Sequence, residues 1–241
     1  MINNFFLSFH SFAQPFIPFN RKMSSKAEDQ ATETSQKLPR SYFMVVIILS
    51  VFQMALVCTL EQVCGMFLGI YLTNGRMKMG MDTSSYVIAA CGLAFTTGRL
   101  INIYLTKLVP TKALQAVFML LVMSGYVILG LVETGQTRLV WMAAVFIGFG
   151  ESPVFPLTMS FLEKRASITN TVQMSNQIAS TLSFMLSMFI VGAWVPMNPN
   201  LFVYICWGLC LTTITMFIIM NVTDLWKRNL QERQENEVLV D

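Results

Sequence analysis

Residues 43–73 read FMVVIILSVFQMALVCTLEQVCGMFLGIYLT, an apolar run in which Glu61 is the only charged side chain. A helix needs about 20 apolar residues to cross the roughly 30 Å hydrocarbon core of a bilayer, and this run is longer than that. A carboxylate near the middle of such a helix costs about 2.5–3.5 kcal/mol to insert, so it rarely persists without a partner or a polar pathway. The run therefore predicts a membrane-spanning helix that carries a polar site.

Five more apolar runs follow, and together they predict an all-α membrane protein with six transmembrane helices. The expected spans are residues 43–73, 84–105, 113–132, 138–162, 168–194 and 200–222. The composition agrees, because 54% of the residues are hydrophobic and only 12% are charged, against about 25% charged residues in soluble domains. The net charge of +3 is too small to indicate a nucleic-acid partner. We expect an integral multi-pass protein whose main contact is the lipid bilayer.

The 16 Lys and Arg residues predict the orientation of these helices, since cytoplasmic loops of membrane proteins are enriched in both. Most of them precede the first span, follow the sixth, or fall in the second and fourth connections; only Arg76, Lys78 and Arg138 fall on the other side. Both termini are therefore expected in the cytoplasm. The expected organisation is a largely disordered cytoplasmic segment at residues 1–41, the six-helix domain at 42–223 and a cytoplasmic tail at 224–241.

The fourth span contains GFGESPVFP at residues 148–156, near its centre. Pro153 and Pro156 each lack a backbone N–H, which leaves a carbonyl one turn earlier without its helical partner. Irregular backbone at this depth is tolerated where it lies inside the protein or lines a cavity, and broken helices often mark the binding sites of transporters. With Glu151 beside the prolines, we interpret this segment as part of a site. A proline-kinked packing helix is the alternative.

Glu61 shares its expected helix face with Gln53 and Gly65, at spacings of eight and four residues. Its carboxylate can ligate a sodium ion, carry a proton or accept hydrogen bonds from a polar solute. The alternative is a structural glutamate that is held protonated or bonded to a neighbouring hydroxyl. Apart from a sodium ion at Glu61 or Glu151 we expect no metal and no cofactor, since the only histidine, His10, lies outside every span.

A polar stripe opens the fifth span and reaches about its middle. Gln177, Ser180 and Thr181 continue a series that begins with Asn170 and Gln173, at roughly helical spacing. Amides and hydroxyls both donate and accept hydrogen bonds, as recognition of a neutral polyhydroxylated solute requires. The same groups also hold membrane helices together, for about 0.6 kcal/mol each. The polar stripe can therefore either bind a solute or hold neighbouring helices together, and the sequence does not decide between these roles.

Arg99 lies near the expected cytoplasmic end of the second span, directly after Gly98. Its side chain can snorkel to the lipid headgroups or pair with a carboxylate at the same depth, for which Glu163 is the candidate. The second interpretation makes Arg99 part of a gating ion pair. The spans contain no Ser/His, paired-Asp or metal constellation that suggests catalysis, so we do not expect an enzyme.

Three segments resemble the C-terminal half of major facilitator superfamily transporters, and within that superfamily the fucose:proton symporter branch and the related animal sodium-dependent glucose transporter-like proteins. The segments are LEQVCGMF at residues 60–67, SSY at 84–86 followed by GRL at 98–100 and Pro110, and GFGESPVFP at 148–156. The resemblance covers about residues 42–223. It implies helices seven to twelve of a twelve-helix fold, with a 3+3 inverted repeat whose first and fourth helices line a central cavity.

In that family the sugar and the coupling ion bind between two six-helix halves, which rock to give alternating access, and the plasma membrane is the usual location. The resemblance therefore implies a secondary active transporter that moves a hexose-like solute with Na⁺ or H⁺. The 241 residues contain one such half, so we expect a second six-helix half or a homodimer partner to complete the cavity. The alternative is a truncated, non-transporting membrane protein that is inert or regulates a full-length relative.

Overall fold

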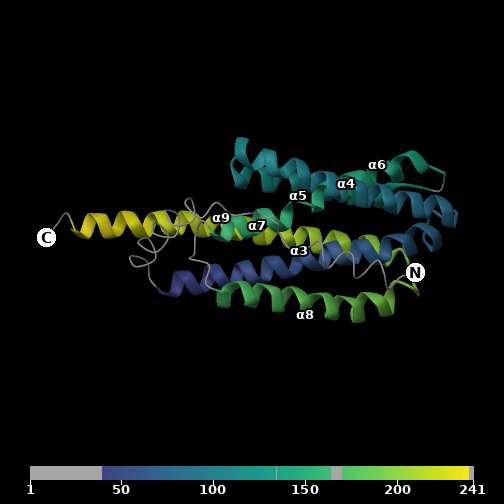
Figure 1. Cartoon of the computed structure of the whole chain (residues 1–241). Helices are drawn as coiled ribbons and strands as arrows, with labels where there is room; N and C mark the ends of the chain where they lie inside the picture. Colours follow the sequence, from purple (N-terminus) through teal and green to yellow (C-terminus); the bar gives the residue numbers. More distant parts are fainter. Residues whose placement is uncertain (1–39, 134, 164–169, 239–241) are drawn as a thin grey trace. The chain divides into compact units, whose positions relative to one another are not determined.

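The structure is a computed structural model that describes residues 40–133, 135–163 and 170–238 (Figure 1), so the segment expected at residues 1–41 lies almost wholly outside the described residues. Every regular element in these ranges is an α-helix. The helices are α3 (Arg40–Asn74), α4 (Met81–Leu108), α5 (Thr111–Leu131), α6 (Thr137–Glu151), α7 (Val154–Glu163), α8 (Asn170–Trp194) and α9 (Leu201–Val238). The predicted all-α class is therefore confirmed for the described part of the chain.

Six helical stretches are long and apolar enough to cross a membrane, as predicted, and α6 and α7 together make the fourth. The stretches are Met44–Asn74, Met81–Leu108, Thr111–Leu131, Thr137–Leu162, Val172–Trp194 and Leu201–Thr223. The second is longer than expected at both ends, because the charged Asp82 and Lys107 continue the helix beyond the apolar run. These helices support an integral multi-pass membrane protein.

The helices gather around the first and fourth spans. α3 packs mainly against α8 and α9, whereas α6 packs mainly against α4 and α5; Figure 1 shows α8 alongside α3. A smaller contact between α3 and α7 joins the two groups. α4 and α8 are the least covered of the spans. Their open faces must be covered by lipid or by another protein.

Three aromatic side chains tie α3, α5 and α9 together in the core. Tyr71, Tyr126 and Phe202 are all buried, and the Phe202 ring centroid lies 5.5 Å from that of Tyr71 and 6.5 Å from that of Tyr126. Aromatic pairs at such spacings stabilise by about 0.5–1.5 kcal/mol beyond the area that they bury. The Tyr71 hydroxyl also donates a hydrogen bond to the Leu129 carbonyl at 3.1 Å. This cluster fixes how the helices of the two groups meet.

The fourth span is interrupted between α6 and α7, at Ser152 and Pro153. Since Pro153 has no N–H, the carbonyl of Phe149 loses its helical donor. The Ser152 N–H lies 3.4 Å from the Gly148 carbonyl, and the ladder resumes with Leu157 N–H to the Pro153 carbonyl at 3.0 Å. Both residues of the interruption are buried. The irregular backbone therefore lies inside the protein and not against lipid.

The two prolines of this segment play different roles. Pro153 lies in the interruption itself, whereas Pro156 is the third residue of α7 and is exposed. The first turn of a helix has backbone N–H groups without intrahelical partners, so a proline is tolerated there. Only Pro153 therefore accounts for the break.

Candidate functional site

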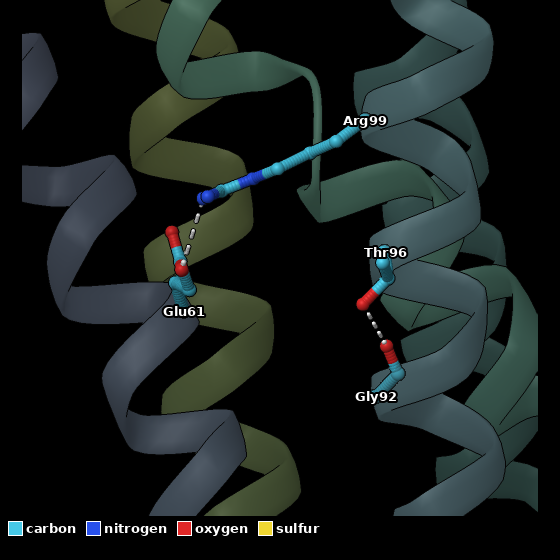
Figure 2. A network of polar contacts seen from close by, with 4 residues as sticks. All are labelled: Glu61, Gly92, Thr96 and Arg99. Carbon is cyan, nitrogen blue, oxygen red and sulfur yellow. Dashed lines mark hydrogen bonds and ion pairs between the residues drawn. The ribbon is translucent and has the colours of Figure 1, made fainter. Parts of the chain in front are cut away.

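An ion pair joins the first and second spans. Arg99 Nη2 on α4 lies 3.7 Å from Glu61 Oε1 on α3, and 37% and 15% of the two side chains, respectively, are exposed. Figure 2 shows the Arg99 side chain extended from α4 toward Glu61. The described residues therefore cover the pair only in part.

The surroundings of Arg99 explain why its side chain extends in this direction. The guanidinium carbon lies 4.5 Å from the centroid of the Phe95 ring, which is a favourable cation–π distance. Its Nε is buried and has no hydrogen-bond partner. The guanidinium therefore keeps a donor, Nε, that Glu61 does not use.

Gly98, directly before the arginine, sets how closely α4 approaches the interrupted helix. A Cβ on Gly98 would lie 2.8 Å from the Phe149 carbonyl oxygen and 3.2 Å from the Ser152 Cβ. Only glycine permits this approach without a shift of the neighbouring backbone. Through Gly98, the backbone of Arg99 is thus held next to the break between α6 and α7. The Arg99 side chain itself contacts Glu61 and Phe95.

Small residues leave the surface beside the ion pair open. Neither Gly65 on α3 nor Gly92 on α4 has an atom within 4 Å of the position that a Cβ would take. Figure 2 shows Thr96 on the same side of α4 as Arg99, with its hydroxyl bonded to the Gly92 carbonyl at 3.0 Å. The face around the pair therefore combines a carboxylate, a guanidinium and a hydroxyl with free space.

The fifth span contributes Ser180 to the same neighbourhood. Its side chain lies beside the thiol of Cys58, which is near enough to Glu61 and Arg99 to interact with their charges. Sequence analysis did not single out Cys58, so this link was missed. Its one signal was its position three residues before Glu61, which places the two about one helical turn apart.

Gln177 and Thr181, the other two predicted solute-binding residues, are exposed on α8. They line a shallow surface hollow together with Ile178, Leu182 and Met185, and the Thr181 hydroxyl donates to the Gln177 carbonyl at 2.9 Å. In the described part of the chain neither side chain bonds to Glu61 or Arg99. They belong to the open face of α8 and not to the ion pair.

Gln53 does not share the face of Glu61, contrary to the expectation from its spacing. Its side chain is fully buried, and neither its Nε2 nor its Oε1 has a hydrogen-bond partner among the described residues. Eight residues along an α-helix amount to a rotation of about 80°, which is enough to turn one side chain into the core and the other toward the open side. Gln53 is therefore not part of the surface around Glu61, and a buried amide of this kind suits a bound water.

Glu151, the last residue of α6, lies in the core and 6% of it is exposed. Its Oε1 accepts a hydrogen bond from the Tyr126 hydroxyl at 2.7 Å, and Trp207 Nε1 in turn donates to the Tyr126 carbonyl at 3.0 Å. Sequence reasoning missed Tyr126, whose only signal was a lone phenol in an otherwise apolar span. Among the described residues no cation contacts Glu151. The two glutamates thus have different environments.

Arg99 pairs with Glu61 on the neighbouring α3, a partner that the sequence did not suggest. Glu163, the carboxylate that the sequence offers as a partner of Arg99, ends α7, and its side chain lies outside the described residues. The pairing depends on which helices adjoin α4, and residue depth alone does not reveal this.

No cluster of three or more His, Cys, Asp or Glu side chains that could hold a metal is present within residues 40–133, 135–163 and 170–238. The cysteines of these ranges are all free thiols. No protein-family model matches the chain, and no curated protein matches it. The chemistry of the site therefore follows from the contacts of Glu61, Arg99 and Glu151.

Proposed function

We propose that this chain is one six-helix half of a secondary active transporter of the major facilitator type. It moves a small polar solute of the hexose class together with Na⁺ or H⁺, by alternating access against a second six-helix half or a second copy of the chain. The observation that carries the proposal is the partly exposed pair of Glu61 on the first span and Arg99 on the second, 3.7 Å apart. Ionisable groups at membrane depth are costly and characteristically line solute or ion pathways.

The packing of the helices supports a 3+3 inverted repeat. Under such a repeat the first three spans correspond to the last three, in the same order. The contacts of α6 with α4 and α5 then correspond to the contacts of α3 with α8 and α9, and these are the strongest helix contacts on each side. The first and fourth spans occupy equivalent central positions, and each carries a glutamate.

The proposed roles follow from position. Glu61 and Glu151 bind the coupling ion or a solute hydroxyl, and Arg99 opens and closes the path as its bond to Glu61 breaks and forms. We assign Ser180 to the same solute, because it lies beside Cys58, one helical turn from Glu61. The polar side chains on the open face of α8, Gln177 and Thr181, face the second half.

The distribution of Lys and Arg residues along the sequence supports cytoplasmic termini, and the resemblance to the transporter family favours the plasma membrane.

A second candidate function rests on the open faces of α4 and α8. A truncated half with these faces can occupy the interface of a full-length relative and regulate it without transporting a solute. Both functions require a partner, but only the first requires the ion pair.

Uptake measurements separate these two functions. Protein purified from expressing cells with any bound partner is reconstituted in liposomes, and labelled glucose uptake is followed under an inward Na⁺ or proton gradient. We expect uptake that Glu61→Gln abolishes and that Glu133→Gln leaves unchanged, since Glu133 is exposed outside the spans. Uptake no higher than that of empty liposomes, with the protein fully incorporated, would favour the regulatory function.

A further inference from the structure

The interruption of the fourth span contains two oxygen atoms that lack a hydrogen-bond donor from their own helix. Pro153 has no N–H, so the Phe149 carbonyl has lost the donor that a continuous helix would provide. The Ser152 side chain is fully buried, and its Oγ has no hydrogen-bond partner among the described residues. A buried polar atom without a partner is costly and calls for a group that can satisfy it.

Both oxygen atoms lie against α4, directly beside Arg99. The position that a Cβ on Gly98 would take is 2.8 Å from the Phe149 carbonyl oxygen and 3.3 Å from Ser152 Oγ. Arg99 is the next residue, and its Cα follows about 3.8 Å further along the chain. The long, flexible Arg99 side chain therefore begins close to both oxygen atoms, although it extends toward Glu61 in this structure.

The bond between Arg99 and Glu61 is a loose one. The distance of 3.7 Å from Arg99 Nη2 to Glu61 Oε1 is longer than that of a hydrogen bond. A guanidinium carries several N–H donors in a planar fork, and here the Nε donor is buried without a partner. Arg99 thus has unused donors close to acceptors that lack one.

The break also attracts a positive charge. α6 ends at Glu151, and Phe149 lies in its last turn. The carbonyl end of a helix carries a partial negative charge that stabilises a cation near the last turn, and Lys and Arg side chains bond the last carbonyls of helices in this way. The break therefore fits a guanidinium both in charge and in hydrogen bonding.

We propose that the Phe149 carbonyl and the Ser152 hydroxyl form a second binding site for the Arg99 guanidinium. Arg99 then alternates between Glu61 on the first span and this site in the fourth. The inference deepens the proposed role of Arg99 in opening and closing the path, and it rests on the proposed function. When the guanidinium moves to the break, the carboxylate of Glu61 is released to bind the solute or the ion. Ser152 is a positioning residue, because it acts on the solute only through Arg99.

Labelling with phenylglyoxal, a reagent that modifies guanidinium groups, tests the second site without any solute. The whole chain with its bound partner is labelled in liposomes, and modified Arg99 is quantified by mass spectrometry against Arg138, which is exposed. We expect Arg99 in Glu61→Gln to be labelled no faster than in the wild type, because the guanidinium moves to the buried break. Faster labelling in Glu61→Gln would show a guanidinium without a second partner and would overturn the inference.

Two variants of the break, each in the Glu61→Gln background, test whether the break protects Arg99. Pro153→Ala gives the Phe149 carbonyl an N–H donor, and Ser152→Ala removes the hydroxyl while Pro153 stays in place. We expect both to accelerate labelling of Arg99, by about tenfold for Pro153→Ala, since a hydrogen bond to a charged group contributes at least this factor to an equilibrium. Because Ser152→Ala keeps the interruption, it tests the site even if Pro153→Ala straightens the span.

Pro156→Ala in the same Glu61→Gln background is the matched control. It leaves the Phe149 carbonyl without an N–H donor, so we expect no change in the labelling of Arg99. Equal labelling in the Pro153→Ala, Ser152→Ala and Pro156→Ala combinations would place the protection of Arg99 elsewhere and would overturn the inference.

Transport measurements distinguish failure of this inference from failure of the proposed function. We expect Ser152→Ala alone to lower the maximal rate of gradient-driven glucose uptake and to leave the half-saturating glucose concentration unchanged. An unchanged maximal rate would overturn the role of the second site in transport. Wild-type uptake together with faster labelling of Arg99 in Glu61→Gln would overturn the second site and leave transport in place. The expected labelling pattern in a protein without any uptake would leave the second site in place and overturn transport.

Discussion

Arg99 on the second span and Glu61 on the first form an ion pair 3.7 Å apart, although their two helices make few backbone contacts with each other. α3 packs mainly with α8 and α9, and α4 packs mainly with α6. The pair is therefore one of the links between the two groups of helices, beside the contacts of α5 with α9 and of α3 with α7. A change in this bond is well placed to alter how the groups lie relative to each other.

Removal of either charge is expected to destabilise the protein by about 1–2 kcal/mol, between the values typical of exposed and buried ion pairs. Glu61→Gln, Arg99→Gln and the double variant form a mutant cycle, which thermal unfolding in detergent measures. The double variant should lose less than the sum of the two single variants. Strictly additive losses would show that the two side chains do not interact.

Gly98→Ala is expected to destabilise the protein by about 1–3 kcal/mol, the usual range for overpacking. The new Cβ would lie 2.8 Å from the Phe149 carbonyl oxygen, a backbone atom that cannot rotate away. Gly92→Ala on the same helix is the matched control, since no atom lies within 4 Å of its Cβ position. Equal thermal stability of the two variants would contradict the close approach of α4 to the interruption.

Tyr126→Phe removes the hydrogen bond that Glu151 accepts at 2.7 Å and should lower stability by about 1–3 kcal/mol. Tyr71→Phe is the control, because it removes a buried hydroxyl that donates to the Leu129 carbonyl at 3.1 Å. We expect both variants to unfold at lower temperature, but only Tyr126→Phe to alter the pH dependence of uptake. An identical pH profile in both would separate the phenol from the function of Glu151.

Pro153→Ala restores the backbone N–H that the interruption lacks, so the fourth span can become a continuous helix. We expect higher thermal stability, by up to about 3 kcal/mol. Uptake should also be slower if the proposed alternating access uses the interruption as the place where the fourth span moves. Pro156→Ala should change neither property, since Pro156 lies in the first turn of α7. Wild-type uptake rates in Pro153→Ala would argue that the break is only a packing feature.

The spans could be predicted from sequence because hydropathy over about 20 residues is a strong signal that depends on no partner. The break at Pro153 was also predictable from the sequence, since the missing N–H is a property of proline itself. The pairing of Glu151 with Tyr126 was not, because the two lie 25 residues apart on helices whose approach depends on tight glycine contacts. Gln53 and Glu61 illustrate the same limit. Their spacing gives a rotation of about 80° around the helix axis, but which of the two side chains is buried depends on where the neighbouring helices pack.

Uptake of labelled glucose by charge-reversed variants tests the central claim, that the Glu61–Arg99 pair lies on the transport path, most directly. Glu61→Arg, Arg99→Glu and the double variant are compared with the wild type, all purified with their bound partners and incorporated to equal density in liposomes. The account predicts that each single reversal abolishes gradient-driven uptake and that the double reversal restores a measurable part of it. Wild-type uptake in both single variants, or no uptake by the wild type, would contradict it.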